Sequence, residues 1–124
     1  MQNGKRPPDI QERTFAFAVD VVRFCHRLDE RPGVGRTLSR QLLRSATSIG
    51  ANMEEAQAGQ SRNDFISKTS IALKEARETL YWLRLISAAQ VSSDSELPKL
   101  QVEAQEITKI LGAIIISAKK NNSQ

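Results

Sequence analysis

Apolar residues recur every three or four positions along most of this chain, with polar residues between them. This spacing places apolar side chains on one face of an α-helix, and the strict alternation of a half-buried strand is absent. Four segments carry the pattern, which predicts helices over about residues 9–31, 37–58, 62–89 and 96–119. The expected core positions, taken helix by helix, are Phe17, Ala18, Val21, Phe24, Cys25 and Leu28; Leu38, Leu42, Ala46, Ile49, Met53 and Ala56; Phe65, Thr69, Ala72, Ala76, Leu80 and Leu83; and Leu100, Ala104, Ile107, Leu111, Ile114 and Ala118.

Helix start and stop signals support these boundaries. Asp9 with Glu12 three residues later is a capping signature for the first helix, and residues 32–35 (PGVG) interrupt the helical pattern after it. Ser61 followed by Asp64 gives the same kind of start for the third helix. Helices of roughly 22 residues, each about 33 Å long and joined by short loops, favour antiparallel neighbours. We therefore predict an all-α fold, an antiparallel up-down-up-down four-helix bundle that forms a single domain over residues 1–124.

The run of small residues over 45–52 (SATSIGAN) would form a poor isolated helix, since Gly50 alone costs about 1 kcal/mol relative to alanine. Small side chains let helix axes approach one another. The run therefore predicts close packing of the second helix against a neighbour.

Two segments are apolar on nearly every side of their helices, residues 80–86 and 110–116, and the first helix has a second apolar stripe. A helix that is apolar all round is buried all round, which in a bundle of this size indicates contacts between subunits. We expect Trp82 to meet either an edge of the bundle or another subunit. The residues expected at a homo-oligomer interface are Phe15, Val19, Val22, Tyr81, Trp82, Leu85, Ile110 and Ile115.

The chain is mildly basic, with 18 Lys and Arg against 14 Asp and Glu, and its basic residues are concentrated in one segment. Residues 31–44 hold four arginines and no acid, and Arg36, Arg40 and Arg44 are spaced to lie along one helix face. Two interpretations remain open. The arginines contact phosphates of RNA or DNA, or they form a solvated face that pairs with carboxylates of a neighbouring helix.

Residues for catalysis or metal binding are scarce. His26 and Cys25 are the only histidine and cysteine, and adjacent helix positions diverge by about 100°, so they form no nucleophile–base pair. We expect His26 at the surface or at a helix end. The Glu-x-x-His pairs of di-iron bundles and the phosphate-binding P-loop frame are also missing. We therefore expect no enzyme activity, no cofactor and no metal. The carboxylate pairs Glu75/Glu78 and Glu103/Glu106 are expected in solvated charge networks with Lys74, Arg77 and Lys109.

The single cysteine suits a reducing compartment, and no apolar run reaches the roughly 20 residues of a membrane helix. The first ten residues lack the apolar core of a signal peptide. We expect a cytoplasmic protein with no membrane partner.

Residues 42–56 (LLRSATSIGANMEEA), 64–66 (DFI) and 71–85 (IALKEARETLYWLRL) resemble the four-helix-bundle family encoded in intervening sequences of bacterial large-subunit ribosomal RNA genes. The resemblance covers about residues 13–120. It implies a closed up-down bundle that assembles as a ring, typically a pentamer. It also implies kinship with the accessory proteins of diversity-generating retroelements, which are basic barrel-shaped pentamers that bind nucleic acid and a reverse transcriptase. This chain is much less basic than those proteins.

Together these observations predict a non-enzymatic oligomeric scaffold that binds nucleic acid or a ribonucleoprotein partner. The alternative is a protein–protein interaction adaptor that binds no nucleic acid. A salt titration separates them, because phosphate binding weakens steeply as salt rises.

Overall fold

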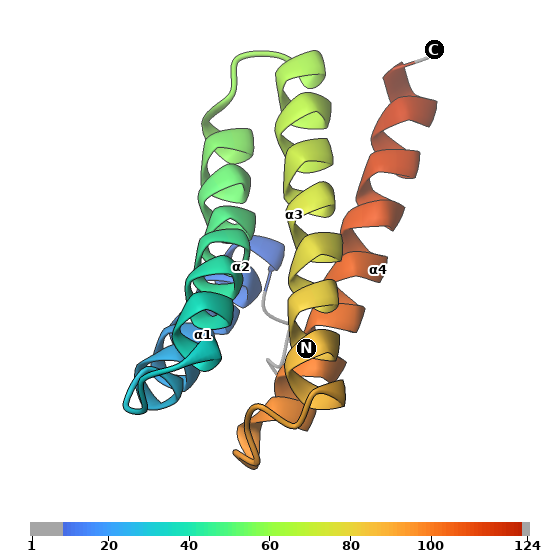
Figure 1. Ribbon diagram of the computed structural model, residues 1–124. Helices are drawn as coiled ribbons and strands as arrows, with labels where there is room; N and C mark the ends of the chain where they lie inside the picture. The colour runs from blue at the N-terminus through green and yellow to red at the C-terminus, as the bar shows by residue number, and fades with distance from the viewer. Residues whose placement is uncertain (1–8, 123–124) are drawn as a thin grey trace, which may run out of the picture.

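The computed structural model describes residues 9–122, and all regular secondary structure in this range is helical. The helices are α1 (Ile10–Leu28), α2 (Val34–Ala58), α3 (Arg62–Ala88) and α4 (Glu96–Asn122). Helix α2 packs against α1 and α3, and α4 packs against α3 and α1, so the four helices form one bundle (Figure 1). The predicted all-helical, four-helix bundle is confirmed at this level.

Two of the predicted helix starts are confirmed by their caps. The Asp9 carboxylate accepts a hydrogen bond from the backbone N–H of Glu12 at 2.8 Å, at the start of α1. The Ser61 hydroxyl accepts one from the backbone N–H of Asp64 at 3.0 Å, at the start of α3. Each cap satisfies a backbone donor that the first helical turn cannot satisfy internally.

The expected boundaries between the first two helices were wrong by about three residues on each side. Helix α1 ends at Leu28 instead of Arg31, and α2 begins at Val34 instead of Thr37. Arg31 precedes a proline, which disfavours helical backbone angles at the preceding residue. Gly33 supplies a φ of +132°, a value that favours glycine, and the chain can then enter α2 directly.

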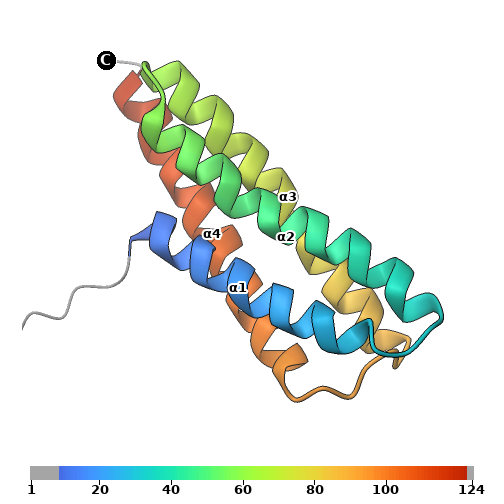
Figure 2. The same ribbon diagram turned by 90° about the vertical axis from the view of Figure 1, so that its left-hand side faces the viewer.

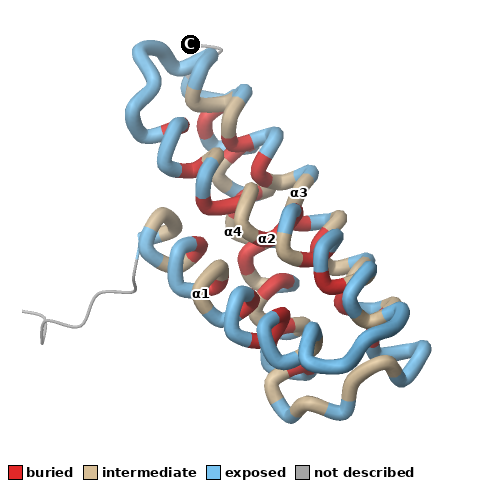
Figure 3. Tube along the Cα trace, turned by 60° about the vertical axis from the view of Figure 1, so that its left-hand side comes forward, coloured by how far each residue is buried: buried red, intermediate tan, exposed pale blue. Residues whose placement is uncertain are grey.

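The bundle core consists of apolar side chains from all four helices. In Figure 3 the buried positions of the helices, in red, lie on the sides that face one another. The largest fully buried apolar side chains of the core are Phe17, Val21, Phe24, Leu42, Ile49, Met53, Leu83, Ile86, Ile107 and Leu111. Six of the expected core positions are only half-buried, namely Ala18, Leu28, Leu38, Phe65, Leu80 and Ile114. Ile115 is buried, with 8% of its surface exposed, whereas Ile114 is only half-buried.

The small-residue run of α2 does allow close approach. A Cβ atom added at Gly50 would lie 3.4 Å from the backbone carbonyl oxygen of Thr14 in α1. On the other side of α2, the buried Ser45 hydroxyl accepts a hydrogen bond from the Thr79 hydroxyl of α3 at 2.9 Å. The run therefore packs closely against both neighbouring helices, as the sequence predicted.

Helix α1 is shorter than the other three and covers only part of their length (Figure 2). Arg13, near the start of α1, donates two hydrogen bonds to the carboxylate of Glu103, at 2.7 and 2.8 Å. Because Glu103 lies in the first third of α4, the rest of α4 extends past the beginning of α1. At that end of the bundle α4 packs against α3 without α1 beside it.

Candidate functional site

The three arginines of the predicted stripe do not share one environment. Arg36, Arg40 and Arg44 are all exposed on α2. The Arg36 Nε–H donates to the backbone carbonyl oxygen of Asp29 at 2.8 Å, which holds this side chain against the α1–α2 turn. Within residues 9–122, no carboxylate lies within 4.0 Å of the guanidinium of Arg36 or Arg40. These two cations therefore remain available to an anion.

Arg44 instead pairs with two carboxylates of α3. Its guanidinium lies 3.3 Å from Glu75 and also contacts Glu78. The hydrogen bond to Glu78 raises the pKa of Arg44. The pKa of Glu78 is lowered first by the hydrogen bond that its carboxylate accepts from Trp82 Nε1–H at 2.9 Å, and then by Arg44. Arg44 therefore belongs to an ion-paired network between α2 and α3, the second of the two sequence interpretations.

The predicted charge networks have different partners from those expected. Glu75 and Glu78 pair with Arg44 of another helix, not with the neighbouring Lys74 and Arg77. Glu103 pairs with Arg13 of α1, and only the Glu106–Lys109 pair, at 3.6 Å, forms within the expected local set.

The residues expected at a subunit interface differ widely in exposure. Phe15 (65%), Tyr81 (54%) and Val22 (47%) are exposed. Half-buried positions are Val19, Trp82, Leu85 and Ile110. Ile115 lies inside its own subunit and offers little surface, which corrects its assignment to the interface.

Trp82 lies on α3, one turn after Glu78. It is half-buried against the core, its N–H bonds to Glu78, and its ring makes an edge-to-face contact with Tyr81 at 5.1 Å between centroids. Trp82 and Arg44 therefore contact the same carboxylate, that of Glu78.

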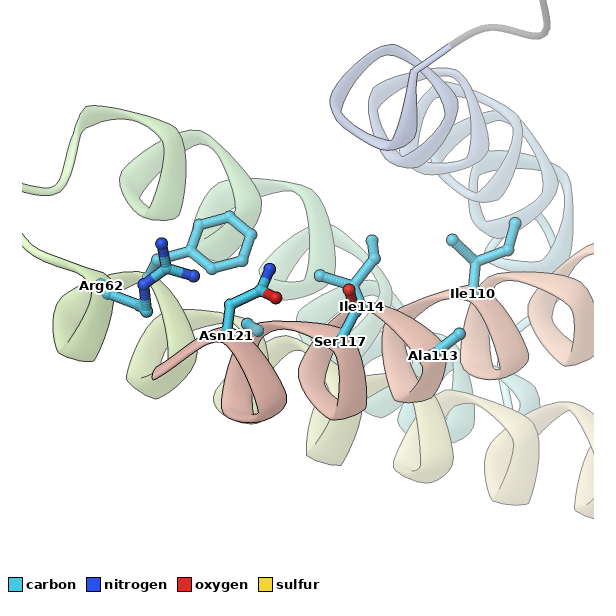
Figure 4. A pocket seen from close by; sticks show the side chains of 8 residues that line it. Arg62, Ile110, Ala113, Ile114, Ser117 and Asn121 are labelled. Atoms are coloured by element: carbon cyan, nitrogen blue, oxygen red, sulfur yellow. The ribbon is translucent and has the colours of Figure 1, made fainter. Parts of the chain in front are cut away.

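A groove that the sequence did not predict lies between α3 and the second half of α4, where α1 is absent. Its volume is about 670 Å³. Figure 4 shows the α4 side chains in a row along the groove, with Arg62 at one end. We call it the α3–α4 groove, and its lining residues are Arg62, Phe65, Ile110, Ala113, Ile114, Ser117, Ala118 and Asn121.

The single cysteine of the sequence is buried in the core. Cys25 is 3% exposed, and its Sγ donates a hydrogen bond to the backbone carbonyl oxygen of Ser39 at 3.5 Å. Burial raises the pKa of the Cys25 thiol, which is opposite to the shift that activates a nucleophile. His26 is exposed, as expected for a surface residue.

Across residues 9–122 there is no cluster of three or more His, Cys, Asp or Glu side chains able to hold a metal ion. No helix in this range has the length and apolar character needed to cross a membrane.

Comparison with known proteins places the chain in a family. No curated protein matches it. A solved structure from Bacteroides thetaiotaomicron, described as a protein of unknown function from the S23 ribosomal protein family, is similar to it with 42% sequence identity and a TM-score of 0.77. The match covers 86% of this chain and 97% of that one. The family model described as 23S rRNA-intervening sequence protein matches residues 8–113, and the chain therefore belongs to this family.

Proposed function

We propose that this protein is a non-enzymatic scaffold, built from four antiparallel helices, that assembles into a ring of identical subunits. The observation that carries the proposal is an apolar stripe on the outside of α1, where Phe15, Val19 and Val22 follow one another at helical spacing and two of them are exposed. Contiguous apolar surface of this kind marks interaction sites on soluble proteins. The family resemblance makes five subunits the best expectation.

The antiparallel part of the proposal is supported by contacts that run in opposite order along paired helices. Gln11, at the start of α1, donates to Glu54 near the end of α2 at 2.6 Å. Cys25, near the end of α1, contacts Ser39 near the start of α2.

Light scattering on the purified protein tests the assembly. We expect a particle several times the 13.8 kDa chain mass at micromolar concentration. A stable 13.8 kDa species would contradict the proposal, whereas a stable particle of another subunit number would contradict only the pentamer.

We further propose that the assembled scaffold binds RNA or DNA through Arg36 and Arg40, with little sequence preference. Repetition of a two-arginine surface around a ring would strengthen a contact that is weak in one subunit. Arg36→Gln/Arg40→Gln should weaken binding. It should also make the salt dependence less steep, by about one unit of slope for each phosphate that the protein no longer neutralises.

Arg44→Gln is the matched control, since Arg44 lies on the same helix but pairs with Glu75 and Glu78. It should leave nucleic-acid binding unchanged. The idea fails if the wild type does not bind at about 50 mM salt, or if the double variant binds as well as the wild type.

The alternative function, a protein–protein adaptor, is favoured by the pairing of surface charges within the chain. Besides the pairs of Arg44, three more ion pairs neutralise basic residues at the surface: Arg13–Glu103, Arg27–Asp94 and Lys68–Glu55. An assembled particle that binds no polyanion at low salt would support this alternative.

A further inference from the structure

The α3–α4 groove is an apolar surface that residues 9–122 leave open. Phe65, Ile110 and Ile114 are half-buried along it, and Ala113 is exposed. The groove exists because α1 starts too far down the bundle to cover this part of α4. Its volume of about 670 Å³ is large enough to admit an apolar side chain from another molecule.

A candidate for that side chain lies on α1. Phe15 is the most exposed large apolar side chain in the described part of the protein, at 65%. It points away from the core, one position after the buried Thr14. A solvent-exposed phenylalanine presents a large apolar area to water, and covering it is correspondingly favourable. We call this residue the Phe15 knob.

The charges around the two surfaces are complementary. The Phe15 knob borders a depression whose other lining residues include Asp9, Glu12 and Glu54. The α3–α4 groove has the basic side chain of Arg62 at one end. An acidic rim facing a basic rim steers two molecules together and disfavours pairing of either surface with itself.

We propose that the Phe15 knob of one copy inserts into the α3–α4 groove of another copy of this chain. This inference rests on the proposed self-assembly and specifies its contact. Because knob and groove are different surfaces, each subunit can offer its knob to one neighbour and its groove to the other. Such a head-to-tail contact generates a ring when the rotation closes.

The test uses two variants at exposed positions, Phe15→Lys in the knob and Ala113→Glu in the groove. Each should weaken self-association on the order of 30-fold or more, because Phe15→Lys removes an aromatic anchor and Ala113→Glu places an unpaired charge in the apolar groove. Ile116→Glu is the control, because Ile116 is 61% exposed on α4 but does not line the groove. It should keep the wild-type particle mass. Unchanged helicity and melting temperature show that each variant subunit still folds.

Mixing the two variants gives the sharpest result. The Phe15→Lys chain keeps an intact groove and the Ala113→Glu chain keeps an intact knob, so we expect a 1:1 complex that cannot grow further. Particle mass is read by light scattering before and after mixing. If both variants keep the wild-type mass, or if the mixture stays monomeric, the knob-in-groove contact is overturned while the scaffold proposal stands. Loss of assembly by Ala113→Glu alone would assign the groove to another segment and equally overturn the role of Phe15. A monomeric wild type would overturn both proposals.

Discussion

Adding one methyl group at Gly50 should stabilise this protein, whereas a larger side chain there should destabilise it. Gly50 is buried in α2 where α1 crosses it. An added Cβ would lie 3.4 Å from the Thr14 carbonyl oxygen and 3.7 Å from the backbone nitrogen of Phe15. These are ordinary van der Waals distances, so an alanine fits. The outer atoms of a larger side chain would face the backbone of α1, which cannot rotate away as a flexible side chain can.

The magnitudes follow from helix propensity and from packing. Replacing glycine by alanine in a helix interior is worth about 1 kcal/mol. We therefore expect Gly50→Ala to raise the free energy of unfolding by about 0.5–1 kcal/mol. In Gly50→Val the two Cγ atoms would force α1 outward, and overpacking of this kind costs about 1–3 kcal/mol. Since valine regains only part of the propensity, its net effect should be destabilising.

Gly112 in α4 provides the matched control, because a Cβ added there meets nothing within 4 Å. Gly112→Ala should show the propensity gain alone, and Gly112→Val should not be destabilising relative to glycine. Urea denaturation of all four variants at one protein concentration measures the differences. The reasoning is refuted if Gly50→Val and Gly112→Val behave alike, because α1 would then not approach α2 closely at Gly50.

The starts of two helices and the close approach of α2 to a neighbouring helix could be predicted from the sequence, because both depend on residues that are near one another along the chain. A cap involves residues three positions apart, so Asp9 and Ser61 could be identified without knowing the fold. The small residues around Gly50 indicated close packing for the same reason, since a run without bulky side chains is useful mainly where a backbone comes near. The position of the first helix end depended on the conflict between helix-forming residues and Pro32, which spacing alone does not resolve.

The properties of the candidate site depended on how the helices lie relative to one another. Arg44 pairs with Glu75 and Glu78 only because the packing of α2 on α3 sets them side by side. Lys74 and Arg77 are closer to these two carboxylates in the sequence, but they form no ion pair with them. The α3–α4 groove likewise exists because α1 does not reach it, and this also leaves Ile114 partly open. The one sequence signal was the all-round apolar segment 110–116, which predicted additional contacts but not a groove.

Two further predictions concern polar contacts between and along the helices. Thr79→Val removes the buried hydrogen bond to Ser45 and should lower the free energy of unfolding by about 1 kcal/mol. Combining it with Ser45→Ala should cost less than the sum of the single changes, because the two residues share one interaction. The pKa of Glu78 is lowered by the hydrogen bond from Trp82 and by Arg44, so the folded state favours its ionised form. The resulting stability is present above the unfolded pKa of about 4.3 and is lost as the pH falls through the lower folded value. Trp82→Phe keeps an aromatic ring but removes the N–H donor, and it should reduce this acid-dependent loss in urea denaturation between about pH 7 and pH 3. Identical pH profiles for the variant and the wild type would show that the contact contributes nothing to the stability of the fold.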